Sequence, residues 1–293
     1  MIAAKVGDRT SRISRIPRHT LSGDRLFSYI VLSVFTVLTL FPIFIMIAVS
    51  LMPSRHLSSD LYHLWPTNID LRNYLLMWSQ LPVAHLLLNS VIIAGGSTIL
   101  ALLTGIPAAF ALSRMNIVGR KIWLFGFLAT QLFSPSIIIV SAYHAMAIAH
   151  LTDTYWGLII LDAGFYSLPF VLWSIAGFMR HIPRELEETV DVDGGSTWTK
   201  IWRVFVPIAI PSIVVAGVYA FIQSWNDFAF ALTLATSQST MPLPIGIYSF
   251  MGAYQIQWNY LMGASLVATL PVLILFLIVQ KRLVSGMLAG SIK

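Results

Sequence analysis

The residues best placed to do chemistry lie in one polar segment, residues 185–207, between two apolar stretches. Carboxylates occupy its first helical turn, where they complement the positive end of a helix. Gly194 and Gly195 then interrupt that helix, and Ser196 is a suitable N-cap for a second one that runs toward Pro207. The sequence therefore predicts a helix, a glycine turn and a helix that protrude into water. Two interpretations stay open from spacing alone: a docking surface for another protein, or a hairpin on the membrane surface.

Two carboxylates, Asp162 and Asp227, fall inside apolar stretches, where an unpaired charge is costly. Asp227 belongs to a run of amide, hydroxyl and aromatic groups, residues 223–228, of the kind that binds sugars by hydrogen bonds and stacking. The alternative is that such residues satisfy backbone groups or join helices. Both interpretations apply to the candidate pathway residues, which are Gln131, Ser134, Asp162, Tyr166, Trp225, Asn226 and Asp227.

The motifs of the common catalytic and nucleotide-binding sites are missing from the chain. No glycine is followed by lysine, so there is no phosphate-binding loop, and neither His-Glu-x-x-His nor Gly-x-Ser-x-Gly occurs. The chain has no cysteine, which excludes disulfides, cysteine-ligated metals and thiol catalysis. We expect no catalytic residue, no metal ligand and no cofactor in this chain.

Composition fixes the class of protein. Hydrophobic residues make up 57% and charged residues 10% of the 293 residues, against about 25% charged in soluble domains, and mean hydropathy is +0.79. Because a spanning helix needs about 20 apolar residues, we predict an all-α membrane protein with six transmembrane helices. The expected spans are residues 26–52, 86–112, 122–148, 156–179, 207–235 and 261–280.

Each of these expected spans contains a proline in its interior: Pro42, Pro107, Pro135, Pro169, Pro211 and Pro271. Membrane helices tolerate proline because neighbouring groups satisfy the freed carbonyls. Kinked or broken helices also surround transport pathways. Both interpretations stay open.

Lysine and arginine set the expected orientation. Sixteen of the 18 fall on the side of the termini and the polar segment, and only Arg55 and Arg72 fall on the other side. The positive-inside rule places both termini in the cytoplasm. The net charge of +6 then indicates topology and contact with anionic lipid, not nucleic-acid binding. On the outer side, residues 66–78 read as a short interfacial helix.

We expect one membrane domain with short polar ends. A basic N-terminal segment covers residues 1–25, the six-helix transmembrane domain covers 26–281 and includes the polar loop at 180–206, and a C-terminal tail covers 282–293. No signal peptide is predicted, since the first apolar stretch is too long and lacks a cleavage site.

The polar segment resembles the EAA loop of permeases from binding-protein-dependent ABC importers. That pattern is Glu-Ala-Ala, three residues, Gly, nine residues, then Ile-x-Leu-Pro, and Glu188, Gly194 and Pro207 match it at the right spacing. Thr189 and Val190 replace the alanines, and Val204 and Val206 replace Ile and Leu. Other matching stretches are Asn73-Tyr74, Leu88-Asn89-Ser90, Trp225-Asn226-Asp227-Phe228, Leu270-Pro271 and the tail from Gln280. The chain thus resembles the carbohydrate-importer group, specifically the six-span, maltose-permease-like subunit, over about residues 26–293.

The resemblance implies a type I ABC importer permease fold and a set of roles. The coupling helix would dock in a cleft of an ATP-binding subunit, with Glu188 paired to a basic residue there and Gly194 making the turn. The implied coupling residues are Glu185, Glu188, Asp191, Asp193, Gly194, Thr197 and Pro207. Gly286, Gly290 and Lys293 would reach toward the ATPase dimer.

The resemblance also implies partners that the chain lacks. These are a sister permease subunit, a pair of ABC ATPase subunits that hold ATP and Mg²⁺, and an extracytoplasmic solute-binding protein. The predicted function is a non-catalytic permease half, in a bacterial or archaeal plasma membrane, for a sugar or related solute. Alternatives are a permease for glycerophosphodiesters and, from another class, a membrane receptor or scaffold that recruits a cytoplasmic partner.

Overall fold

The computed structural model describes residues 21–53, 69–252 and 255–291, and these residues are almost entirely helical. An isolated antiparallel bridge joins Met251 and Ile256. The chain divides into two compact units, residues 1–46 and 47–293. The expected all-α fold class is confirmed.

Helix α1, Leu21–Ser50, supplies the described part of the first unit and runs into the second. Its apolar side chains, from Leu26 to Phe44, are exposed. Pro42 lies inside the helix without ending it. An apolar helix with exposed side chains is what lipid or another membrane helix covers.

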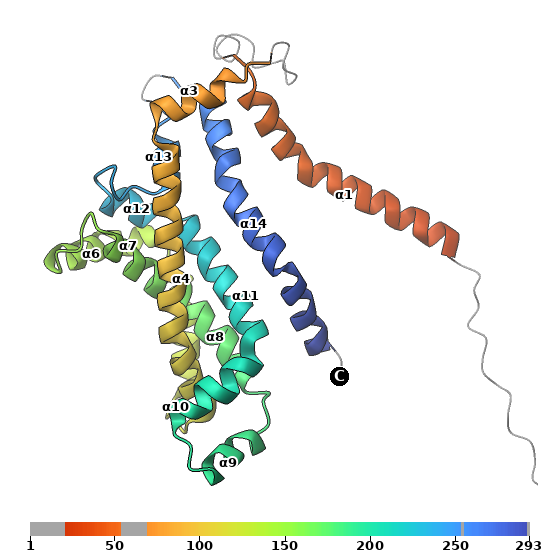
Figure 1. Cartoon of the computed structure of the whole chain (residues 1–293), viewed down its shortest axis with the longest axis vertical. Coiled ribbons are helices and arrows are strands. Elements are labelled where there is room, and N and C mark those ends of the chain that lie inside the picture. The colour runs from red at the N-terminus through yellow and green to blue at the C-terminus, as the bar shows by residue number, and fades with distance from the viewer. Residues whose placement is uncertain (1–20, 54–68, 253–254, 292–293) are drawn as a thin grey trace, which may run out of the picture. The chain divides into compact units, whose positions relative to one another are not determined.

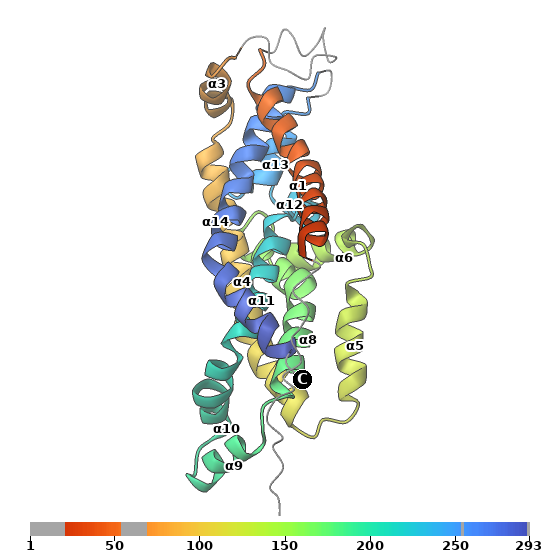
Figure 2. The same ribbon diagram turned by 90° about the vertical axis from the view of Figure 1, so that its right-hand side faces the viewer.

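Three helices form the centre of the second unit: α4 (Val83–Arg114), α8 (Leu168–Met179) and α11 (Val206–Trp225). Small residues on α11, such as Ala209, Ala216 and Ala220, are fully buried against the other two helices. Helix α14, Trp258–Ser291, runs beside α11, as Figures 1 and 2 show. Small side chains let these helices approach closely, which is how helices associate where lipid removes the hydrophobic driving force.

The ends of this unit carry short helices. At one end, α3 (Arg72–Gln80) and α13 (Leu243–Tyr248) lie near the start of α4 (Figure 1). At the opposite end lie α9 (Glu185–Val192) and α10 (Thr197–Thr199). A helix is therefore present in the region of residues 66–78, but it begins at Arg72 and extends to Gln80, and its place at the membrane interface stays a prediction.

Hydropathy and length identify five described helices that could each cross a membrane. They are Leu26–Ser50, Val83–Arg114, Tyr155–Met179, Thr197–Trp225 and Trp258–Gln280. A sixth span is reached if α5 (Arg120–Thr130) and α6 (Pro135–Ile148) are counted together. These two helices are bent by 98° at their junction, so the prediction of one continuous span over 122–148 is wrong. Ser134 caps α6 and Pro135 is its first residue, so a new helix starts at this proline.

The predicted fifth span, residues 207–235, is also shifted. Its helical run starts at Thr197, passes through the π-helical turn η2 (Lys200–Phe205), and ends at Trp225. A separate short helix, α12 (Ala229–Leu234), follows. A second π-helical turn, η1 (Asp162–Ser167), joins α7 (Tyr155–Leu161) to α8. Such turns occur often at functional sites.

A polar network fixes the loop between α12 and α13. Asn89, which is fully buried on α4, donates to the carbonyls of Ser239 and Met241 at 3.1 and 2.8 Å, and accepts from the Tyr155 hydroxyl at 2.8 Å. Asp153 accepts from Thr240 Oγ1 at 2.5 Å and from the backbone amide of Ser237 at 3.0 Å. The bond from Thr240, followed by those from the loop amides, lowers the pKa of Asp153 below its ordinary value.

Candidate functional site

The polar segment forms a helical hairpin, residues 185–205, at one end of the helix bundle (Figure 1). Gly194 makes its turn with φ of +69°, a conformation that side chains rarely adopt. The Gly195 amide donates to the Val190 carbonyl at 2.8 Å, and a Cβ at Gly195 would lie 2.4 Å from Val190 Cγ1. Ser196 caps the second helix by accepting from the Thr199 amide at 3.3 Å. The predicted helix, glycine turn and helix are thus present.

The side of this hairpin that points away from the helix bundle, called its outer side below, is exposed. Val192 is 87% exposed and Trp198 is 59% exposed. Glu185, Glu188, Asp193 and Thr197 are also exposed. Glu185 begins α9, and Asp193 is the C-cap residue that follows it. A large aliphatic and an indole side chain surrounded by carboxylates are suited to contact another protein.

Asp191 faces back across the hairpin. Its carboxylate pairs with Lys200 at 2.6 Å, and this ion pair joins α9 to η2. The Asp191 side chain remains 58% exposed. An ion pair in this position holds the two halves of the hairpin together, and water weakens it.

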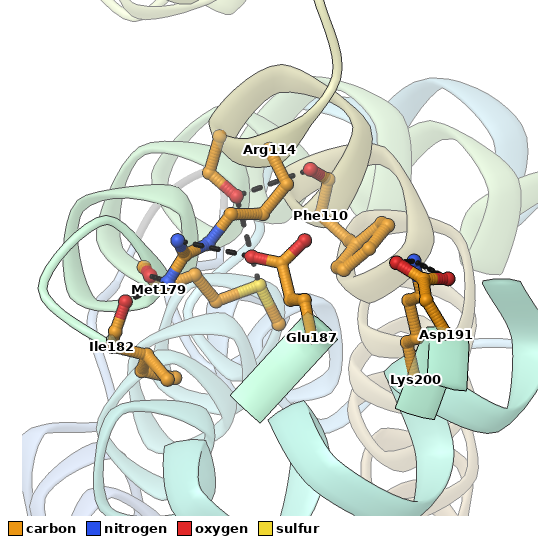
Figure 3. A network of polar contacts seen from close by, with 8 residues as sticks. Phe110, Arg114, Met179, Ile182, Glu187, Asp191 and Lys200 are labelled. Atoms are coloured by element: carbon orange, nitrogen blue, oxygen red, sulfur yellow. Dashed lines mark hydrogen bonds and ion pairs between the residues drawn. The ribbon is translucent and has the colours of Figure 1, made fainter. Parts of the chain in front are cut away.

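The hairpin is attached to the bundle by Arg114, the last residue of α4 (Figure 3). Its guanidinium donates to the carbonyl of Met179, the last residue of α8, and to that of Ile182, which follows this helix. It also lies 3.1 Å from Glu187 Oε1 on α9, and 4.9 Å from the centre of the Phe205 ring on η2. The Arg114 side chain is 5% exposed and that of Glu187 is 18% exposed. One buried cation therefore contacts four segments of the chain.

Sequence reasoning did not identify this contact. Arg114 entered the prediction only as one of sixteen cations on one side of the membrane, and Glu187 only as an acid in a first helical turn. No local spacing pairs the two residues, because they lie on different helices. The available signal was the position of Arg114 at the end of a long apolar run. There the five N–H donors of a guanidinium can bind the free carbonyls at the end of a neighbouring helix.

The second half of the hairpin enters the core. Ile201 and Phe205 are buried, and Phe205 meets Phe110 of α4 edge to face at 5.0 Å. Trp198 and Trp202 belong to the same segment, but both are exposed and their ring centres lie 5.9 Å apart. Pro207 stands in the first turn of α11, within a helical run that has already begun at Thr197.

Three of the candidate pathway residues meet in the membrane part. Asp162 is fully buried and accepts from the Ser224 hydroxyl at 2.5 Å. Asp227 accepts from the Tyr166 hydroxyl at 2.9 Å and from the Ala231 amide at 2.9 Å. Asp162 and Asp227 line one small cavity of about 10 Å³, enough for about one water molecule. Asp227 lies beyond the end of α11, so its expected place inside a continuous span is wrong.

The other four candidate pathway residues have separate partners. Gln131 donates to the carbonyls of Phe165 and Tyr166, both at 3.0 Å, and so serves the π-helical turn η1. Ser134 caps α6. Trp225 is buried and stacks on Phe221 at 5.6 Å, while Asn226 is exposed and donates to the Ile222 carbonyl at 2.9 Å.

The C-terminal residues continue the last helix. Gly286 and Gly290 lie within α14, which passes from the expected span through to Ser291. Lys293 lies outside the described residues. In the part of the chain that the structure describes, no group of three or more histidine, cysteine or acidic residues is arranged to hold a metal ion.

The chain matches a known family over most of its length. Residues 20–288 match the model of the binding-protein-dependent transport system inner membrane component. The chain belongs to this family. The hairpin at 185–205 therefore sits in a multi-pass membrane permease, and the resemblance to ABC importer permeases of the carbohydrate group is confirmed.

Individual relatives agree. The chain is 31% identical over 265 residues to the sulfoquinovosyl glycerol transport system permease protein SmoH of Agrobacterium fabrum, covering 90% of this chain and 93% of the relative. It is 28% identical to the trehalose transport system permease protein SugB of Mycobacterium tuberculosis, covering 87% and 92%. A chain of the crystal structure of a bacterial alginate ABC transporter, in complex with an alginate pentasaccharide-bound periplasmic protein, matches with a TM-score of 0.61 at 16% identity, covering 89% and 96%. The permease fold is thus shared.

Proposed function

We propose that this permease forms half of the translocation pathway of an ATP-driven importer and takes its energy from a separate ATPase through the 185–205 hairpin. The observation that carries this proposal is the hairpin itself. Its outer side exposes Glu188, Val192 and Trp198, while its inner side is fixed to the helix bundle by Arg114. A partner that holds the outer side can move the helices to which the inner side is attached.

The chemistry of ATP belongs to the partner. The chain carries no phosphate-binding loop, so ATP and Mg²⁺ would bind in the ATPase subunits and this chain would have no catalytic role. Glu188 would pair with a basic residue of the ATPase cleft. Closure of the ATPase pair would then move the hairpin and open the pathway to the outside.

The transported solute is proposed to be a sugar or a related polyol. The relatives named above are assigned to sulfoquinovosyl glycerol and trehalose transport. Solute would arrive on an extracytoplasmic binding protein, and a sister permease would complete the pathway. The termini and the hairpin would face the cytoplasm, as the distribution of lysine and arginine predicts.

We propose that Asp162, Tyr166 and Asp227 support this pathway without binding the solute directly. Asp227 already accepts hydrogen bonds from Tyr166 and from the first amides of α12. A carboxylate with these partners stabilises the start of a helix. Exposed Asn226 is the better candidate for contact with a solute in this region.

Affinity purification of the tagged chain in mild detergent tests the proposal. The expected result is recovery of a second permease and an ATPase, with ATP hydrolysis in the purified complex. Glu188→Gln should reduce recovery of the ATPase, whereas Arg120→Gln, which changes an exposed charge outside the hairpin, should not. Recovery of a non-ATPase partner by the wild-type chain would support a receptor or scaffold instead.

A further inference from the structure

We infer that Arg114 is the positioning residue through which movement of the 185–205 hairpin reaches the membrane-spanning helices, and that its ion pair with Glu187 is the connection. This inference rests on the proposed function, because it concerns how the same hairpin passes on movement imposed by an ATPase. It adds a route inside this chain that neither the EAA pattern nor the exposed hairpin surface specifies.

The geometry gives the two terminal nitrogens of the guanidinium separate partners. One terminal nitrogen lies 3.1 Å from Glu187, and the other donates to the Met179 and Ile182 carbonyls (Figure 3). The face of the group lies over Phe205. Lysine, with a single ammonium group, does not reproduce this planar fork. Arginine at this position ties α9 to the ends of α4 and α8 at once.

Burial makes the connection stiff. A charge that is 5% exposed loses its partner only at a large cost, since water does not replace the partner. When α9 moves, the favoured response is therefore that α4 and α8 follow, not that Glu187 separates from Arg114. The Asp191–Lys200 pair differs, because both of its residues belong to the hairpin and the Asp191 side chain is 58% exposed.

Contacts around Arg114 connect its movement to the central helices of the bundle. Helix α4 packs along both α8 and α11. Phe205 precedes α11 directly and is fully buried against Phe110 of α4. A displacement of Arg114 is thus passed on to the three central helices.

Glu187→Gln is the critical variant. The amide removes the charge on α9, yet Arg114 keeps its carbonyl partners and its place over Phe205, so the helix ends stay capped. We expect this variant to recover the ATPase and to hydrolyse ATP at the wild-type basal rate. Arg120→Gln serves as the matched control, since it changes an exposed cation on the same side of the chain and leaves the connection intact.

The readout is the reactivity of one introduced cysteine at Asn226, which is exposed at the end of α11. Because the chain has no cysteine of its own, a membrane-impermeant thiol reagent then labels this chain at one position. Labelling is measured by mass spectrometry in the complex, with and without ATP plus vanadate to trap the ATPase. In the wild-type background and in Arg120→Gln, trapping should change the labelling rate several-fold; in Glu187→Gln that change should be lost.

The outcomes separate the two ideas. If the wild-type chain brings down no ATPase, the proposed function and this inference both fail. If the wild-type complex responds to trapping and Glu187→Gln responds equally, only the inference is wrong. If Glu187→Gln no longer recovers the ATPase, Glu187 is a docking residue and the inference is again wrong. Arg114→Lys is a second test and should weaken the response while the ATPase is still recovered.

Discussion

Gly194 gives the sharpest test of the hairpin, because the position has a strained conformation and free space around it. Its φ is +69°, and no atom lies within 4 Å of where a Cβ would be. A substitution there meets no clash, so its cost is conformational alone. For an ordinary side chain this cost is about 1–2 kcal/mol, and we expect a β-branched residue to cost more.

The expected consequence follows from that number. A penalty of about 1.4 kcal/mol reduces the population of the native turn about tenfold relative to alternatives. Gly194→Val should therefore uncouple ATP hydrolysis from uptake, while Gly194→Asn should retain much of the coupling, since asparagine tolerates this conformation. The assay is uptake and ATP hydrolysis in proteoliposomes containing the whole complex.

A matched control lies in α4. Gly95 also has free space around its Cβ position, but its φ is not positive, so Gly95→Ala should leave coupling unchanged. Normal coupled uptake in Gly194→Val would refute the reasoning. Equal loss of coupling in Gly194→Val and Gly194→Asn would show that the partner requires the absence of a side chain at residue 194, not the backbone conformation.

Three further predictions concern the rest of the fold. The pKa of Asp153 is lowered, chiefly by Thr240, so its contribution to stability is present above its ordinary pKa and lost as pH falls below about 4; the melting midpoint should drop less on acidification in Asp153→Asn than in the wild type. Asn89→Ala should lower the free energy of unfolding by about 1–3 kcal/mol, because the three hydrogen bonds that this buried side chain makes to Ser239, Met241 and Tyr155 are lost, and a thermal melt with unchanged midpoint would contradict this. Tyr166→Phe should cost about 0.5–1.5 kcal/mol of stability and leave solute affinity unchanged, whereas lost affinity at unchanged stability would assign Asp227 to the pathway.

The hairpin could be predicted from sequence because its determinants are local. A glycine at the turn, a serine cap and a first turn rich in acids act within a few residues of one another. Four of the six spans could be predicted for a similar reason, since lipid demands long apolar helices. Long apolar runs and local caps can both be recognised without knowledge of the tertiary structure.

The attachment of the hairpin could not be predicted in the same way. Arg114 and Glu187 meet only because α4, α8 and α9 end near one another. In a chain with many cations on one side, nothing local distinguishes the buried arginine from those that only set topology. The break before α6 is a different case, since Ser134 and Pro135 carry a helix-start signature that the surrounding apolar residues obscured.

Polar residues in the membrane part of this chain share a physical role. Arg114 caps the carbonyls at the end of α8, Asp227 accepts the first amides of α12, and Gln131 serves carbonyls of η1. Each lies where a helix ends or changes its pitch, and there backbone groups lose their partners within the helix. Lipid offers no water to replace those partners, so a side chain must. A polar residue inside an apolar run is therefore evidence for an interrupted helix before it is evidence for a bound solute.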